Sequence, residues 1–163
     1  MTRAVLSLGS NLGDRLGHLQ RAVDGFHDDL VAVSPVYETT PWGVRDQGDF
    51  LNAVLLVAAD NVDEWTWLRR GQRLEDQADR RRTLRWGPRT LDVDVVSVDQ
   101  VRSDHPDLLL PHPGTPVRAT VLVPWLDVEP DAVLPGHGRV ADLVAGLDTE
   151  GVRRRDDLRL EWR

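Results

Sequence analysis

The segment 91–96, Leu-Asp-Val-Asp-Val-Val, constrains the fold of this chain more than any other. Apolar and acidic residues alternate along it, which is the period of a half-buried strand. In a strand, residues two apart point to the same face and lie roughly 7 Å apart. The apolar residues therefore enter a core, while Asp92 and Asp94 converge on one spot outside it.

Two carboxylates at this spacing repel each other unless a cation lies between them, and hard oxygen ligands select Mg²⁺ or a similar ion. For a bare Asp-x-Asp, a strand whose acids only keep the chain soluble is the commoner explanation. The flanking residues favour the metal site, because Gly87-Pro88 stiffens the entry to the strand and Arg89 precedes Asp92 by three residues. Arginines beside a carboxylate-bound metal indicate a third, negatively charged group, and phosphate is the expected one.

The bulk properties narrow the class of protein. A chain of 163 residues fits one compact domain, 1–163, and is long enough for a hydrophobic core. It has no cysteine, hence no disulfides or thiolate chemistry. We find no signal peptide and no run of the roughly 18 apolar residues that span a membrane, so we expect a cytoplasmic protein with no membrane partner.

The net charge of the chain and its distribution indicate which partners to expect. The net charge of −7 argues against a nucleic-acid surface and leaves small molecules as partners of a protein that we expect to be a monomer. Positive charge is concentrated locally, in Arg80, Arg81, Arg82, Arg85 and Arg89. A second basic run, Arg153-Arg154-Arg155, lies among acids, and we interpret it as a solvated tail.

Periodicity and turn residues predict the element order β-α-β-β-α-β. The expected strands are 4–8, 31–37, 50–59 and 90–98, and the expected helices run to about 27 and about 78, with short helices at 115–123 and 140–147. This order predicts an α+β, ferredoxin-like fold, an antiparallel sheet with both helices on one face, plus C-terminal additions.

Helix starts and turns follow from local residues. Gly9-Ser10 reads as a turn, and Asn11 as the cap of the first helix. Although this segment joins a strand to a helix, it matches neither nucleotide-binding glycine motif, so we interpret it as structural. Asn61 and Glu64 resemble a capping box for the second helix. That helix is expected to bury Trp65, Leu68 and Leu74, and residues 111–114 form a rigid turn.

An ordered series of short motifs resembles the 6-hydroxymethyl-7,8-dihydropterin pyrophosphokinase family. The motifs span about residues 5–130, and the joined Arg-Trp-Gly-Pro-Arg-Thr-Leu-Asp-x-Asp and Phe-Leu-Asn-Ala pieces are the specific ones. They are Leu-Gly-Ser-Asn-Leu-Gly-Asp at 8–14, Ser-Pro-Val-Tyr-Glu-Thr-Thr-Pro at 34–41, Asp-Phe-Leu-Asn-Ala at 49–53, Leu-Glu at 74–75, Arg80, Arg82, the segment 85–94, Pro-His-Pro at 111–113 and Arg118.

The resemblance implies a pyrophosphoryl transfer in folate biosynthesis. The hydroxymethyl oxygen of the pterin attacks the β-phosphorus of ATP, and AMP leaves. Two Mg²⁺ ions are implied, both held by Asp92 and Asp94, with ATP as co-substrate. Arg80 and Arg89 are implied to neutralise the triphosphate, which suits a reaction that needs mainly positioning and charge neutralisation. The arginine-rich loop is implied to close over ATP.

The resemblance also assigns the two substrates to residues. Asn52 offers donors and an acceptor that match the mixed edge of a pterin, and Phe50 is implied to stack on the ring. The implied pterin-binding residues are Thr39, Thr40, Pro41, Trp42, Phe50 and Asn52. The implied ATP-binding residues are Gln72, Glu75, Arg82, Trp86, Val95 (through its backbone), His112 and Arg118.

A departure from the family pattern affects the pterin-binding end. Thr120 stands two residues after Arg118, where the family places an aromatic residue that closes the pterin sandwich. Its loss costs about 1 kcal/mol of pterin affinity by analogy with aromatic pairs, and Trp42 or Trp125 is the hypothesised substitute.

Two alternatives to the pyrophosphokinase stay open. Thr120 motivates a catalytically weakened homologue that binds nucleotide or partner folate enzymes, although the intact acidic and arginine residues speak against it. A generic metal-dependent phosphate hydrolase would use the Asp pair, but it leaves the Phe-Leu-Asn-Ala motif unexplained.

Overall fold

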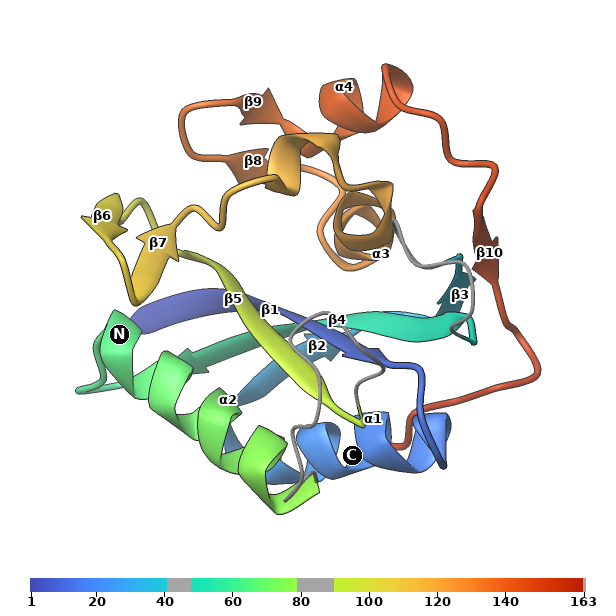
Figure 1. Cartoon of the computed structure of the whole chain (residues 1–163). Coiled ribbons are helices and arrows are strands. Elements are labelled where there is room, and N and C mark those ends of the chain that lie inside the picture. Colours follow the sequence, from blue (N-terminus) through green and yellow to red (C-terminus); the bar gives the residue numbers. More distant parts are fainter. Residues whose placement is uncertain (41–47, 79–89, 163) are drawn as a thin grey trace.

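A computed structural model of the protein describes residues 1–40, 48–78 and 90–162. Within these ranges, six strands form one antiparallel sheet in the order β10-β3-β4-β1-β5, with β2 also paired to β4 (Figure 1). The strands are β1 (Thr2–Ser10), β2 (Leu30–Val33), β3 (Tyr37–Thr39), β4 (Phe50–Ala59), β5 (Asp92–Val98) and β10 (Val152–Arg154).

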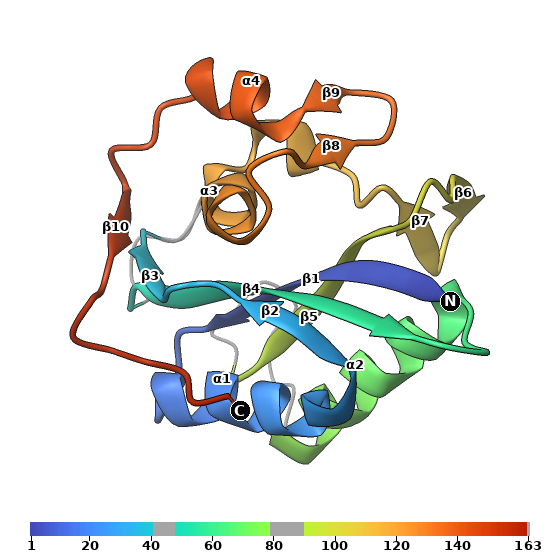
Figure 2. The same cartoon turned by 180° about the vertical axis from the view of Figure 1, so that it is seen from behind.

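Helices cover both faces of this sheet. The helices α1 (Arg15–Gly25) and α2 (Glu64–Ala78) lie side by side on one face, and α3 (Ala119–Val128) lies on the other (Figures 1 and 2). The core follows the predicted βαββαβ order, and the later elements are additions that cover the second face. The remaining elements are η1 (His27–Asp29), β6 (Ser103–His105), β7 (Leu108–Leu110), η2 (Thr115–Val117), β8 (Val133–Leu134), β9 (Gly138–Arg139) and α4 (Val140–Ala145).

The sheet has a hydrophobic core on each face. Leu6, Leu55 and Trp67 belong to the core under α1 and α2. Val54 and Trp125 belong to the core under α3. Burial on both faces explains why the middle of β4 reads as a continuous apolar run rather than as an alternation.

The start of the first helix differs from the prediction. The strand β1 continues through Gly9 and Ser10, so the predicted turn there is wrong. The cap of α1 is Asp14, whose Oδ1 accepts a hydrogen bond of 3.0 Å from the N–H of Gly17. Asn11 instead donates from Nδ2 to the carbonyl oxygen of Gly48, at 3.3 Å. An acid three residues nearer the helix outcompetes the asparagine as cap.

The predicted strand 31–37 is split into β2 and β3, both of which pair with β4. Ser34 lies at the break, where its N–H donates to the Val54 carbonyl oxygen at 2.9 Å and its Oγ accepts from the Val54 N–H at 2.8 Å. The next residue, Pro35, has no N–H to continue the ladder. The serine hydroxyl therefore replaces the missing strand partner.

The helix α2 ends at Ala78 as predicted, but it begins differently. Asp63 accepts from the N–H of Thr66 at 2.9 Å, whereas Asn61 has a left-handed φ of 59° and does not cap the helix. The buried positions of the helix are Trp67, Gly71 and Glu75.

The predicted buried side of α2 is therefore wrong in part, because Trp65, Leu68 and Leu74 are only half-buried against the core. A Cβ at Gly71 would lie 2.9 Å from Cγ1 of Val93. The glycine lets the helix approach β5 more closely than any other residue would. The face of α2 that contacts the sheet is therefore centred on positions 67, 71 and 75.

Two C-terminal predictions also change. The predicted helix 115–123 is the turn η2 followed by α3, which passes through Pro124. It continues because Leu122 and Trp125 are both fully buried, and their packing offsets the hydrogen bond that proline removes. The basic run at 153–155 is not a solvated tail, since Val152–Arg154 forms the edge strand β10.

Candidate active site

The register of three adjacent strands places Asp92, Gly9 and Asn52 in one row across the sheet. Gly9 of β1 is paired with Asp92 of β5 on one side and with Asn52 of β4 on the other. Neighbouring strands are about 4.8 Å apart, so the backbones of Asp92 and Asn52 lie about 10 Å apart across the glycine. Asp94 pairs with Ser7 one step further along the same face. The sheet thus brings the predicted metal ligands and the predicted pterin ligand to one surface.

Gly9 forms the floor between them. A Cβ at this position would lie 3.1 Å from Nδ2 of Asn52 and 3.5 Å from Cδ1 of Phe50. Any larger residue would occupy the space between these two side chains and the acidic pair. Sequence reasoning missed this role, although a glycine inside an apolar strand marks a close approach.

The acidic pair has the predicted orientation. Val93 and Val95 are 5% and 4% exposed in the core under α1 and α2, and the side chains of Asp92 and Asp94 are half-buried on the opposite face. The residues described here contain no cluster of three or more His, Asp or Glu that could hold a metal. A pair of carboxylates suits Mg²⁺, which binds one or two protein carboxylates and completes its shell with phosphate and water.

Glu75 braces the strand that carries this pair. Its carboxylate, 8% exposed, accepts a hydrogen bond of 2.9 Å from the N–H of Val93, at an edge strand of the described sheet. The predicted adenosine contacts differ in their exposure to a ligand. Gln72 is exposed, whereas Glu75 is buried against β5. The side chain of Val95 lies in the core, so only its backbone is left for a ligand.

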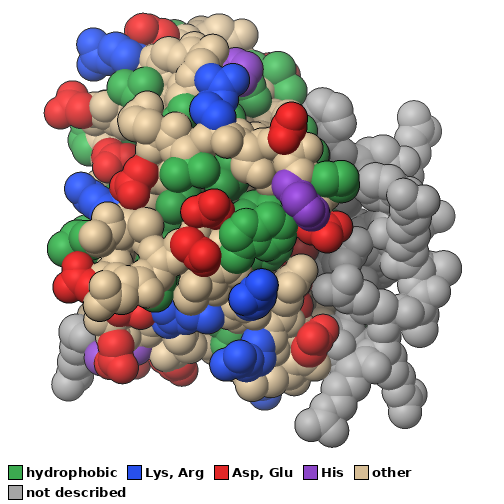
Figure 3. All heavy atoms as spheres, turned by 90° about the vertical axis from the view of Figure 1, so that its left-hand side faces the viewer, with side chains coloured by type: hydrophobic (Ala, Val, Ile, Leu, Met, Phe, Trp, Pro, Cys, Tyr) green, Lys and Arg blue, Asp and Glu red, His purple; other side chains and the backbone are tan. Residues whose placement is uncertain are grey.

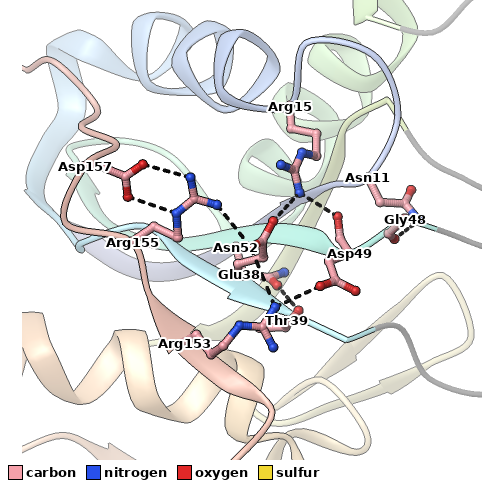
Figure 4. Close-up of polar contacts among 10 residues, drawn as sticks. All are labelled: Asn11, Arg15, Glu38, Thr39, Gly48, Asp49, Asn52, Arg153, Arg155 and Asp157. Atoms are coloured by element: carbon pink, nitrogen blue, oxygen red, sulfur yellow. Dashed lines mark hydrogen bonds and ion pairs between the residues drawn. The ribbon is translucent and has the colours of Figure 1, made fainter.

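The amide of Asn52 is held in one orientation. Its Oδ1 accepts from the hydroxyl of Thr39 at 2.5 Å (Figure 4). Its Nδ2 donates to the carbonyl oxygen of Leu8 at 3.3 Å. Because both ends of the amide are fixed, its donor and acceptor are presented in a set order to anything bound above Gly9.

His112 lies within electrostatic range of both Asp92 and Arg118. The N–H of His112 donates to the carbonyl oxygen of Val96 at 2.8 Å, which ties the turn 111–114 to β5. Burial lowers the pKa of His112, the Arg118 charge lowers it further, and Asp92 and a Pro113 hydrogen bond act in the opposite direction. The imidazole is therefore neutral at pH 7 and shares its surroundings with Asp92 and Arg118.

A cavity of about 310 Å³ adjoins the pterin end. Its walls come from β3, from the start of α3 and from the C-terminal segment, and include Thr39, Thr40, Thr120 and Val152. Trp125 does not line it, because that indole is 1% exposed in the core and donates to Glu129 at 2.9 Å. The hypothesis that Trp125 substitutes for the missing aromatic is therefore wrong.

Six of the predicted site residues lie outside the described residues: Pro41, Trp42, Arg80, Arg82, Trp86 and Arg89. A second cavity, of about 600 Å³, is lined by α1 and by residues 159–162, including Gln20 and Trp162. It shares no residue with the row described above, so its size carries no argument about the reaction.

The surface is of mixed charge where it is seen. On the face that carries the β6–β7 hairpin, acidic and basic side chains are interspersed rather than gathered by sign (Figure 3). Among the described residues, each helix is too short or too polar to cross a bilayer.

Known proteins share both the sequence and the fold. Proteins named 2-amino-4-hydroxy-6-hydroxymethyldihydropteridine pyrophosphokinase match from Mycobacterium leprae (51% identity, covering 94% of this chain and 88% of the relative), Mycobacterium tuberculosis (46%, covering 98% and 90%) and Pseudomonas aeruginosa (38%, covering 93% and 96%).

Solved structures of Plasmodium falciparum HPPK-DHPS share the fold. The wild type with SDX-DHP gives a TM-score of 0.68 at 13% identity, over 94% of this chain. This chain spans 47% of that longer one. The likeness supports the antiparallel α+β architecture and nothing finer.

A family model described as 7,8-dihydro-6-hydroxymethylpterin-pyrophosphokinase matches residues 5–130, more than half of the chain. On this match and on the relatives above, the chain belongs to the 7,8-dihydro-6-hydroxymethylpterin-pyrophosphokinase family.

Proposed function

We propose that this protein transfers the pyrophosphoryl group of ATP to the hydroxymethyl group of 6-hydroxymethyl-7,8-dihydropterin, releasing AMP, in folate biosynthesis. The observation that carries the proposal is the row formed by Asp92, Gly9 and Asn52. It sets an oxygen-ligand pair for a cation and a fixed amide for a heterocycle about 10 Å apart on one face of the sheet.

At the pterin end, Asn52 reads the polar edge of the ring and Phe50 packs against its face. Thr39 holds the Asn52 amide, so the donor and acceptor meet the ring in register. Thr40, Pro41 and Trp42 are proposed as further contacts with the ring. Gly9 leaves the space that the ring occupies.

At the phosphate end, Asp92 and Asp94 hold Mg²⁺, for which two ions are proposed. Bound Mg²⁺ neutralises charge on the phosphate oxygens and orients them. Arg118 and neutral His112 contact the ATP phosphates from the turn after β7. The remaining proposed contacts with ATP are Gln72, Glu75, Arg80, Arg82, Trp86, Arg89 and the Val95 backbone.

The chemical step follows from this placement. The pterin hydroxymethyl oxygen forms a bond to the β-phosphorus and releases its proton to water. The bond from that phosphorus to the α,β-bridging oxygen breaks, and AMP carries that oxygen away. The protein contributes position and charge neutralisation, which is what a phosphoryl-type transfer requires. The single-domain organisation, monomeric state and cytoplasmic location stay predictions from the sequence.

One assay separates the proposal from its alternatives. ATP and Mg²⁺ are incubated with the protein, with and without 6-hydroxymethyl-7,8-dihydropterin, and the nucleotides are resolved. We expect AMP to form only with the pterin. No AMP in either case would favour a weakened homologue, and ADP formed without pterin would favour a phosphate hydrolase; both would overturn the proposal.

A further inference from the structure

The C-terminal segment adds an edge strand to the pterin end of the sheet. After α4 the chain descends past α3 and lies beside β3 as β10 (Figures 1 and 2). The register pairs Val152 with Thr39 and Arg153 with Glu38. The N–H of Arg155 donates to the Val36 carbonyl oxygen at 2.8 Å and extends the contact by one residue. This strand lies beyond residues 5–130, the part that the family model matches.

Two arginines of this segment form ion pairs with acids on β3 and just before β4 (Figure 4). Arg153 Nη2 lies 2.8 Å from Asp49 Oδ2 and 3.6 Å from Glu38 Oε1. Arg155 Nη1 lies 3.0 Å from the same Glu38 oxygen, and its other nitrogens bind Asp157. The Glu38 side chain is 17% exposed, so its contact with Arg155 is screened by water less than a surface pair is. The Arg153–Asp49 contact, with side chains 48% and 37% exposed, is a surface pair.

The helix side holds the same two acids. Arg15 Nη1 lies 2.7 Å from Glu38 Oε2 and donates to the Asp49 carbonyl oxygen at 2.9 Å. Together the three arginines restrict the motion of the end of β3 and the start of β4. The hydrogen bond from Arg15 is the first cause that holds the pKa of Glu38 below its usual range, and the Arg155 hydrogen bond adds to it.

The residues held in this way adjoin the proposed pterin contacts. Thr39, paired with Val152, donates to the Asn52 amide, and Asp49 directly precedes Phe50. The acidic pair lies elsewhere, because β10 is at one edge of the described sheet and β5 is at the other. A loosened C-terminal segment would therefore disturb one substrate site more than the other.

We propose that residues 148–157 position the pterin end of the site, with Arg153 and Arg155 as positioning residues that touch no substrate. The proposal rests on the proposed function for the identity of the ligand. Without the two arginines, substrate binding itself has to order the end of β3 and the start of β4. The apparent affinity for the pterin then falls in proportion to the fraction of molecules that are already ordered before binding.

The test compares R153A/R155A with R153K/R155K and with R154A. Arg154 is the control on the same strand, because its Nε pairs with Asp156 and its other interactions are with Tyr37 and Asp127 rather than with Glu38 or Asp49. We expect R153A/R155A to raise the KM for the pterin by roughly tenfold and to leave the KM for ATP and kcat within about twofold. The lysine variant should recover part of the loss, and R154A should match the wild type. Equal rises in both KM values, or no rise, would overturn the proposal.

Hydrogen exchange provides a readout that does not depend on activity. In R153A/R155A, amides in 36–40 and 48–52 should exchange faster, while those in 92–98 should not change. If wild-type protein makes no pterin-dependent AMP but this pattern appears, the proposed function fails and the ordering role stands. If AMP forms normally and exchange is unchanged or rises everywhere, the positioning role fails alone.

Discussion

The carboxylate of Glu75 accepts a hydrogen bond of 2.9 Å from the backbone N–H of Val93, the residue between Asp92 and Asp94. Gly71, one turn earlier on α2, brings the helix within van der Waals reach of the same valine. A buried side chain thus fixes the strand at the point where two carboxylates leave it on the opposite face.

Two substitutions of Glu75 should separate the effect of its hydrogen bond to β5 from the effect of its negative charge. In E75A the buried Val93 N–H loses its acceptor, which costs about 1–3 kcal/mol of unfolding free energy. We expect kcat to fall with it, because the Asp pair is less firmly placed. E75Q keeps an oxygen acceptor and should retain most of the stability. Urea unfolding and AMP release measure both effects, and an E75A protein as stable as the wild type would contradict the bracing role.

Gly9 should be intolerant of a methyl group for a reason specific to the pterin. In G9A the new Cβ lies 3.1 Å from the Asn52 amide, so either the amide moves or the pterin is displaced. Overpacking of this size costs about 1 kcal/mol or more, a rise of at least about fivefold in the KM for the pterin.

The matched control for G9A is G146A, where the nearest atom to the new Cβ is the Leu143 oxygen at 3.7 Å. It should leave both KM values unchanged. An unchanged pterin KM in G9A would show that the ring does not lie over the glycine.

Thr120 offers a gain rather than a loss. It lines the cavity of about 310 Å³ beside Thr39, which has room for a ring. T120F should add an aromatic wall worth about 1 kcal/mol, and so lower the dissociation constant of the pterin about fivefold. T120V, which keeps the volume of threonine, is the control. Binding titrations measure both, and a weaker complex with T120F would place the ring away from this wall.

The pH dependence of stability should show the buried phenol of Tyr37. Burial, and then its hydrogen bond to Asp127, raise the pKa of Tyr37 from 10.0 to about 12. The folded state thus keeps the proton that the unfolded chain releases near pH 10. This contribution to stability is fully present below pH 10 and is lost as the pH rises to about 12.

Tyr37 is the sole tyrosine, so phenolate absorbance reports this group directly. The unfolding free energy of the wild type should fall between pH 10 and about 12, and that of Y37F should fall less. A phenol that titrates near 10 in the folded protein would contradict the buried contact with α3.

Local periodicity was sufficient to predict β4 and the orientation of the Asp pair, because both depend on residues two apart in one strand. It was insufficient for β10. The partners of Arg153 and Arg155 are Asp49 and Glu38, 104 and 117 residues away, so a local reading finds only the neighbouring acids. Gly9 was predicted to form a turn. The need for a glycine there is the space beside Asn52, and that contact exists only after β1 and β4 pair.

The most direct test of the central claim is pterin-dependent AMP release by D92A and D94A. Both variants should lose the transfer, because each removes half of the oxygen-ligand pair that we propose for Mg²⁺. D104A, an exposed acid on β6, is the control and should match the wild type. Full activity in either D92A or D94A would contradict the assignment of the acidic pair as the metal end of the site.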